Sequence, residues 1–344
     1  MLPHTYTPDQ AVCLFTPYQG ALLTLENKEQ ILQEGGYYGD ILSVEEMPEP
    51  EYLAVFDQLN DRLAKRLSVP ILQLAKHFDE THPQGKPIAL VSLARAGTPI
   101  GVVMADLLRS RFNREVTHYS MSVIHKYGLD KHAMDYVLER HAPDELLFLD
   151  GWVSQGRITK ALEDSVGQWP GVSSTLYCLS DPSGIQNATA TRDDLLLPSA
   201  VLNAAVSGLL SRTVYNPDGF HFAASYTEQQ GVDRTQAFIE AMLKAVAELD
   251  DVPERQVLNG EQQRPLALAQ IDAICAAYDT KADNIKAGIG EVSRSLLRRI
   301  PRVVVVDDRA AEEADHLFWL AKQRQIPIQV KRLDGPYRAF SVLS

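Results

Sequence analysis

The stretch Glu145–Leu162, with the sequence ELLFLDGWVSQGRITKAL, decides which folds are open to this chain. Its apolar run 146–149 has the length of a strand and ends on Asp150. A loop with two glycines follows, and a helical pattern begins near Ile158. A strand, an acidic residue, a small polar loop and a helix in this order build a phosphate cradle, because loop N–H groups and a helix N-terminus both attract an anion. The sequence therefore predicts an anion site here.

Strand and helix patterns alternate around this stretch. Pro87–Leu93 is an unbroken apolar run, Val116–Ile124 alternates, and Ser174–Leu179 is again apolar. Helical patterns at Ile100–Leu108 and Ala133–Arg140 lie between the strands. Such an order is typical of α/β proteins with a parallel sheet that carries helices on both faces. We predict this fold class for the larger part of the chain.

The C-terminal part carries an α/β pattern of its own. Asp250–Pro265 is polar and contains turn residues, which indicates a linker. Beyond it, Glu291–Arg299 predicts a basic helix and Val303–Val306 a buried strand. The predicted organisation is a large domain over 1–249 with an irregular extension over 1–50, a linker over 250–265, and a small α/β domain over 266–344.

Charge and cysteine content indicate the cellular compartment of the protein and the kinds of partner that it can have. The net charge is −12, but residues 281–344 hold 12 of the 33 basic and 8 of the 45 acidic residues, so a basic module is attached to an acidic body. The three cysteines are odd in number and show no CxxC spacing, which indicates reduced thiols in the cytoplasm. No signal-peptide pattern and no apolar run of membrane length occurs, so we expect no membrane partner. Nothing in the sequence indicates an oligomeric state.

Two strand-end loops are expected to converge on one ligand. Asp150–Thr159 follows one predicted strand and Arg95–Pro99 follows another. In parallel α/β sheets ligands bind beyond the carboxyl ends of the strands, so both loops are expected at the same edge. One loop supplies an acid and small residues, and the other supplies a cation beside Ala96-Gly97.

This pair of loops resembles the plan of the type I phosphoribosyltransferases. The resemblance implies pentosyl transfer from phosphoribosyl pyrophosphate (PRPP) with Mg²⁺ near Asp150, to make or process a nucleoside-like metabolite. It implies catalytic roles for Asp150, Arg95 and Lys126, the last in a basic loop between the two motifs. It implies a pyrophosphate loop of Arg95, Ala96 and Gly97, a 5′-phosphate loop of Ser154, Gln155, Gly156, Arg157, Ile158 and Thr159, and acceptor contacts from Asp181 and Arg212.

A narrower resemblance covers most of residues 90–215. Several segments are similar to a bacterial family found beside tellurite-resistance (Ter) stress genes: Leu93–Gly101, His118–Asp130, Phe148–Thr159, Asp181–Gly184 and Leu197–Thr213. That family is described both as phosphoribosyltransferase-like and as "cysteine protease StiP". It implies a stress-response pathway.

The basic C-terminal segment resembles the pelota-type RNA-binding domain, which is related to proteins that bind kink-turns in RNA. That family opens a helix with Gly-x-Asn-Glu-x-x-Lys, and this chain has Gly288-Ile289-Gly290-Glu291-Val292-Ser293-Arg294. The resemblance implies RNA as a partner, since glycines permit close backbone approach and arginines meet phosphates. The implied RNA-binding residues are Gly288, Gly290, Glu291, Arg294, Arg298 and Arg299.

Three functions remain open at this point. The first is a PRPP-dependent transferase with an appended RNA-binding module. The second is a non-catalytic nucleotide- or RNA-binding regulator on the same fold, because the transferase family has two adjacent acids where this chain has Asp150-Gly151. The third is a cysteine protease, for which Cys13 lies in an irregular stretch while Cys178 lies in an apolar strand.

Overall fold

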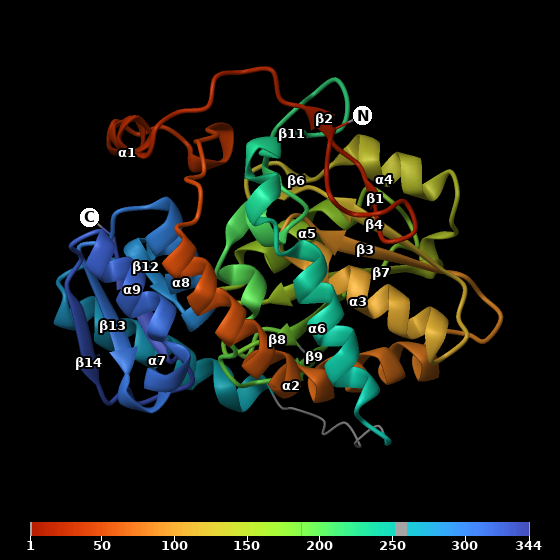
Figure 1. Ribbon diagram of the computed structural model, residues 1–344. Coiled ribbons are helices and arrows are strands. Elements are labelled where there is room, and N and C mark those ends of the chain that lie inside the picture. Colours follow the sequence, from red (N-terminus) through yellow and green to blue (C-terminus); the bar gives the residue numbers. More distant parts are fainter. Residues whose placement is uncertain (1, 187, 252–259, 344) are drawn as a thin grey trace.

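We analysed a computed structural model of the chain, which describes residues 2–186, 188–251 and 260–343. Within these residues, six strands form one parallel sheet that runs through the larger, N-terminal unit (Figure 1). In spatial order they are β1 (Val12–Cys13), β4 (Val116–Met121), β3 (Ile88–Leu93), β7 (Leu146–Trp152), β8 (Leu176–Ser180) and β9 (Thr189–Thr191).

Helices cover both faces of this sheet because its central strands are apolar on both sides. In β3, Leu90 faces one core, whereas Ala89 and Val91 face the other. The first core is closed by α2 (Pro50–Thr81), α3 (Gly97–Ser110) and α6 (Thr235–Ala247), and the second by α4 (Lys131–Leu138) and α5 (Arg157–Val166). The predicted α/β fold is confirmed.

Smaller elements surround the carboxyl edge of the sheet. The N-terminal extension contains α1 (Leu25–Gln33) and a 3-10 turn at Tyr38–Asp40. The chain also forms a second sheet of β10 (Leu210–Val214), β11 (Phe222–Ser225) and β2 (Thr16–Pro17). The basic loop that carries Lys126 forms the turn of a hairpin between β5 (Val123–Ile124) and β6 (Gly128–Leu129).

The C-terminal unit is a mixed sheet with helices, as predicted. Its strands, in spatial order, are β12 (Ile285–Ala287), β15 (Ala339–Val342), β13 (Val303–Asp307) and β14 (Ile328–Lys331). Its helices are α7 (Gly260–Ala277), α8 (Ile289–Arg298) and α9 (Asp315–Gln323). One side of this sheet packs on α7, and the other side packs on α8 and α9.

The two units share a hydrophobic core. Val292 and Leu296 of α8 and Leu317 of α9 belong to the same buried cluster as Leu53 and Phe56 of α2. Figure 1 shows the C-terminal unit, in blue, beside the first turns of α2. The C-terminal unit is therefore docked on the larger unit through apolar packing.

The local structure differs at three places from what the residue types alone suggest. Pro70 does not interrupt α2, because the buried side chains on either side of it hold the helix together despite the lost hydrogen bond. The segment before β10 contains two short 3-10 turns, Pro198–Ala200 and Asn203–Val206, and no α-helix, since Asn203 and Leu209 have positive φ. The linker predicted over 250–265 overlaps α7, which begins at Gly260, and its residues 252–259 lie outside the described part of the chain. No helix in the described ranges is long and apolar enough to span a membrane.

Candidate functional site

The strand order reverses between β3 and β7, and this reversal creates the site. Counted along the chain, β4-β3-β7-β8-β9 has the order 2-1-3-4-5, and ligands bind where such an order switches. Gly97 opens α3 at this point. A Cβ there would lie 2.8 Å from the Leu149 carbonyl oxygen and 3.2 Å from Cα of Asp150, so a side chain would force α3 away from β7.

A cavity of about 510 Å³ lies beyond these strand ends. Its walls come from the N-terminal extension, the loops of the parallel sheet, the β5–β6 hairpin, β10 of the second sheet and the C-terminal unit. Residues that represent these walls are Tyr38, Asp150, Ser154–Thr159, Arg212, Lys286 and Arg294. The predicted 5′-phosphate loop, Asp150 and the basic C-terminal helix thus meet at one place.

The phosphate loop, Ser154–Thr159, runs directly into the N-terminus of α5. Gly156 caps this helix with φ 76°, a left-handed conformation that suits glycine, and a Cβ there would also lie 2.5 Å from Cδ1 of Ile185. The first N–H groups of a helix have no partner within the helix, and they carry its partial positive charge. The loop therefore has the backbone geometry of an anion cradle.

Side chains of the phosphate loop also bind the C-terminal unit. Ser154 Oγ donates to the Ala287 carbonyl at 2.6 Å, Gln155 Nε2 donates to the Ile285 carbonyl at 3.5 Å, and Arg157 pairs with Asp283 at 2.7 Å. Gln155 and Arg157 are larger than the residues that the transferase pattern usually has here. Their length has a structural reason, since both reach across to β12 and the turn before it.

Asp150 lies in the last part of β7, at the cavity wall. Its Oδ1 accepts the Gly151 N–H at 2.7 Å. Burial raises the pKa of Asp150 to about 7, against the opposing effects of that hydrogen bond and of Arg294, while Glu291 adds to the rise. A carboxyl group with this pKa is easily ionised by a bound cation, which suits contact with a metal or with sugar hydroxyls.

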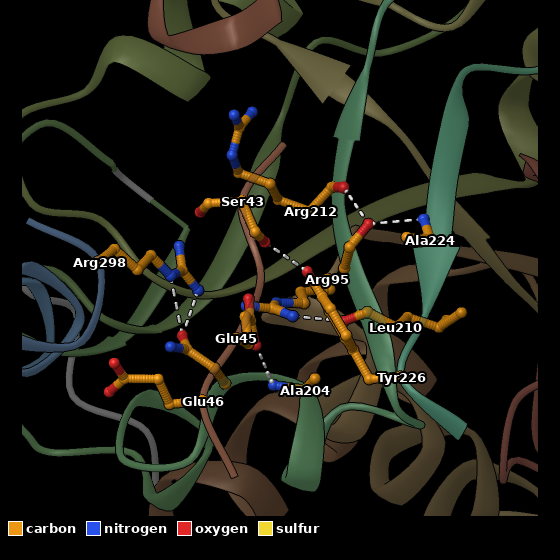
Figure 2. Close-up of polar contacts among 12 residues, drawn as sticks. Ser43, Glu45, Glu46, Arg95, Ala204, Leu210, Arg212, Ala224, Tyr226 and Arg298 are labelled. Atoms are coloured by element: carbon orange, nitrogen blue, oxygen red, sulfur yellow. Dashed lines mark hydrogen bonds and ion pairs between the residues drawn. The ribbon is translucent and has the colours of Figure 1, made fainter. Parts of the chain in front are cut away.

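Arg95 is turned away from the cavity, contrary to the predicted contact with pyrophosphate. Figure 2 shows its guanidinium between the Leu210 carbonyl, to which it donates, and the carboxylate of Glu45, with which it pairs. Only 3% of Arg95 is exposed. Ala96 is buried as well, and Ala94 is the residue of this loop that lines the cavity. Arg95 holds the N-terminal extension against β10.

Lys126 lies at the rim of the cavity. Its Nζ sits over the rings of Tyr37 and Tyr127, at 5.2 and 5.1 Å from the centroids, and its N–H donates to the Tyr37 hydroxyl at 3.1 Å. Tyr37 and the neighbouring His125 line the cavity. The predicted catalytic role of Lys126 stays a prediction.

The two residues predicted to contact an acceptor are separated. Asp181 is fully buried and organises a turn, since it accepts the N–H groups of Ser183 and Gln186 at 3.0 and 2.6 Å and pairs with Arg192 at 2.5 Å. It serves the fold. Arg212, in contrast, projects from β10 into the cavity wall.

Tyr38 is a cavity residue that the sequence patterns did not indicate. Cζ of Arg212 lies 4.3 Å from its ring centroid, and Nζ of Lys28 lies 4.8 Å away. Burial alone would raise the pKa of Tyr38, but Arg212, Lys28, Arg298 and Arg294 outweigh it and lower the pKa to about 7. A phenol whose pKa is lowered to about 7 is therefore part of this site.

The residues predicted to bind RNA face the N-terminal unit. A Cβ on Gly290 would lie 3.1 Å from Cε2 of Trp152, and the N–H that follows Gly288 donates to Asp194. The remaining contacts are Arg294 with Glu291 at 3.2 Å, Arg298 Nε with Asn203 at 2.9 Å, and Arg299 Nε with Glu29 at 2.5 Å. The predicted RNA surface is therefore turned toward the N-terminal unit and the cavity. The sequence could not indicate this, because docking decides which way a helix faces.

Comparison with known proteins identifies the family. The model of "Tellurite-like stress resistance cysteine protease StiP" matches residues 4–243, and that of "PELOTA RNA binding domain" matches residues 266–344. The chain belongs to the StiP family. A protein of Acinetobacter baylyi named "Cysteine protease StiP" is 30% identical over 343 residues, with 92% of this chain and 87% of that protein covered.

Solved structures of a hypoxanthine-guanine phosphoribosyltransferase and of a hypoxanthine phosphoribosyltransferase align with part of this StiP-family chain. The enzyme of Bacillus anthracis is 12% identical with a TM-score of 0.26, covering 37% of this chain and 71% of that one. The enzyme of Trypanosoma cruzi is 17% identical with a TM-score of 0.27, covering 35% and 69%.

The thiols of this StiP-family chain have pKa values shifted in the opposite direction from that of a catalytic nucleophile. Burial raises the pKa of Cys13 to about 12 and raises the pKa of Cys178 and Cys275 as well. A catalytic thiolate requires a pKa below that of free cysteine, which neighbouring cations or a helix N-terminus supply. Six lysine and arginine side chains line the cavity, whereas none of the three cysteines does.

Proposed function

We propose that this protein is a phosphoribosyltransferase-like enzyme that binds PRPP with Mg²⁺. It transfers the pentosyl group of PRPP to an acceptor, and so makes or processes a nucleoside-like metabolite. One observation carries the proposal: the phosphate loop and Asp150 line the same cavity as a cluster of cations. This combination matches a substrate with a sugar between anionic groups. The chain belongs to a stress-resistance family, and we propose that the metabolite takes part in a stress response.

The proposed reaction depends mainly on stabilisation of the charges that develop in its transition state. Loss of pyrophosphate from C1 gives a transition state with positive charge on the sugar and growing negative charge on the leaving group. Fixed cations in a buried site stabilise that leaving group without reorganising water. The phosphate loop would hold the 5′-phosphate, and Asp150 would hold the ribose hydroxyls. Arg212 and Arg294 would then face the leaving group.

The residues at the cavity fit a Mg²⁺ ion that arrives with the substrate. In the described part of the chain, no group of three His, Cys, Asp or Glu side chains is arranged for a metal. The carboxyl groups of Asp150 and Glu291 do line the cavity. Mg²⁺ is commonly held by one or two carboxylates together with substrate phosphates and water. It would supply additional charge neutralisation for the pyrophosphate.

A calorimetric titration of the full chain with PRPP and Mg²⁺ tests the proposal. We expect binding by the wild type and a loss of about tenfold in Asp150→Asn, because a charged hydrogen-bond partner is removed. The matched control is Asp106→Asn, an exposed residue of α3. Ribose 5-phosphate should compete with PRPP. Absence of PRPP binding by the wild type, or equal affinity in Asp150→Asn, would leave the non-catalytic regulator as the better hypothesis.

A further inference from the structure

Positive charge dominates the cavity. Its lining, which lies entirely in the described ranges, holds six cations and three carboxylates. The cations are Arg157, Arg212, Lys286, Arg294, Arg298 and Arg299. Two of the carboxylates are already committed, Asp283 to Arg157 and Glu291 to Arg294. The cavity therefore has more positive charge than its own acids balance.

Most of these cations belong to the C-terminal unit. Lys286 sits on β12 between Ile285 and Ala287, which point into the core of that unit, so strand alternation turns Lys286 toward the cavity. Arg294 and Arg298 are four residues apart on α8 and share one face of the helix. This wall carries the cations that a bound anion would meet.

These cations are held under electrostatic strain. Burial, followed by Arg157, lowers the pKa of Lys286, and burial, followed by Arg298, lowers the pKa of Arg294. Desolvated like charges destabilise each other, and an anion placed among them relieves both effects. Lys286 forms no ion pair with a carboxylate in the described residues. Its amine is available to a ligand.

The shape of the site fits a small ligand and not a folded RNA. A volume of about 510 Å³ falls within the range of cavities that hold small molecules. The backbone of α8 near Gly290 lies against Trp152, and Arg299 is paired with Glu29 of the N-terminal extension. Docking of the C-terminal unit therefore leaves the basic face of α8 open to the cavity only.

We propose that Lys286, Arg294 and Arg298 form an anion subsite beside the phosphate loop, so that the C-terminal unit binds the pyrophosphate end of a small phosphorylated ligand. This inference deepens the proposed function and rests on it for the identity of that ligand. The ligand class is a ribose phosphate that carries a second phosphate or pyrophosphate group. The subsite takes over the role that Arg95 cannot perform, since Arg95 is paired with Glu45 away from the cavity.

Inorganic pyrophosphate is the probe that isolates this subsite. The full chain is titrated calorimetrically with pyrophosphate and, separately, with ribose 5-phosphate. We expect Lys286→Gln and Arg294→Gln each to weaken pyrophosphate binding about tenfold, because each removes a charge-assisted hydrogen bond. Ribose 5-phosphate should bind these variants as it binds the wild type. Lys322→Gln, an exposed charge removal on α9, is the matched control. Circular dichroism confirms that each variant is folded, and Lys286→Gln serves if Arg294→Gln is not.

A hairpin RNA titration of the same variants completes the test. RNA affinity that is equal in Lys286→Gln, Arg294→Gln and Lys322→Gln supports the small-ligand subsite. RNA binding lost in the first two, with pyrophosphate binding unchanged, overturns it in favour of an RNA surface. Wild-type protein that does not bind pyrophosphate also overturns it. If pyrophosphate binds through Lys286 while PRPP does not bind, the subsite stands and the transferase proposal falls. If PRPP binds while pyrophosphate binding does not depend on Lys286, the transferase proposal stands and the subsite falls.

Discussion

The guanidinium of Arg294 lies over the indole of Trp152, with Cζ 4.9 Å from the ring centroid. Arg294 belongs to α8, and Trp152 ends β7 just before the phosphate loop. Gly290 permits this approach, since a Cβ there would press on the indole. The contact joins the two units at the cavity, where the parallel sheet supplies one wall and the C-terminal unit another. A ligand in this cavity would therefore contact both units.

We predict that the two units unfold together. Leu296 of α8 is fully buried in the core shared with α2. Leu296→Ala should lower the free energy of unfolding by about 3 kcal/mol, because it leaves a cavity in that core. Urea denaturation followed by circular dichroism should show a single transition for the wild type and a single transition for Leu296→Ala. Leu266→Ala, at a position 58% exposed, should change the free energy by less than about 0.5 kcal/mol. Two separate transitions in the wild type would contradict the shared core.

Arg95 is expected to affect stability and not ligand affinity. Arg95→Met removes the partner of Glu45 in a buried ion pair, which should cost about 3 kcal/mol of unfolding free energy. Arg95 and Arg298 lower the pKa of Glu45 against the opposing effect of burial. The pair therefore stabilises the fold above the unfolded pKa of glutamate, and this contribution is lost as the pH falls through the lower, folded pKa.

Urea denaturation at neutral and acid pH measures this effect of Arg95→Met. Lys160→Met, which breaks an exposed pair with Asp164, is the control and should have little effect. Normal stability combined with lost pyrophosphate affinity in Arg95→Met would return Arg95 to the binding site, as the sequence first suggested.

Much of this arrangement follows from local patterns, and the remainder depends on contacts between distant segments. The run 146–149, Asp150 and the two glycines predicted a strand, a phosphate loop and a helix, because apolar runs and glycines act locally. The direction of Arg95 depends on Glu45 in an extension without periodicity. The direction of Arg294 depends on how α8 docks. One local signal was overlooked: Ile285 and Ala287 alternate with Lys286, which places that lysine on the opposite face of β12.

Tyr38 should ionise near neutral pH. Absorbance at 295 nm should show one phenol titrating near pH 7, and Tyr38→Phe should remove that step. Because the folded pKa is depressed, the ionised phenol stabilises the fold fully above the unfolded pKa of about 10 and loses this contribution as the pH falls through about 7. Bound pyrophosphate places negative charge among the same cations, so it should shift the titration upward. An unchanged step in Tyr38→Phe would assign the signal to another tyrosine.

The carboxyl group of Asp150, which we propose to bind the ligand, should lower the free energy of unfolding at alkaline pH. Burial raises its pKa to about 7, so the carboxyl group stabilises the fold fully below the unfolded pKa of aspartate and loses this contribution as the pH rises through about 7. Asp150→Asn should therefore increase the free energy of unfolding at pH 8 by at least about 1 kcal/mol. The gain should vanish below about pH 4. Denaturation series at the two pH values measure it, with Asp106→Asn as the control. A variant less stable than wild type at pH 8 would show that the carboxylate supports the fold.

The thiols should react slowly, despite the protease name given to the family. Because burial raises the pKa of all three, iodoacetamide labelling at pH 7 should be no faster than that of glutathione and should increase as the pH rises. Mass spectrometry of the labelled peptides locates each reaction. The double variant Cys13→Ala/Cys275→Ala should keep the wild-type affinity for PRPP and for pyrophosphate, since neither residue lines the cavity. Rapid, selective alkylation of Cys13 at neutral pH would reverse this conclusion, because it would require a thiolate that its buried position disfavours.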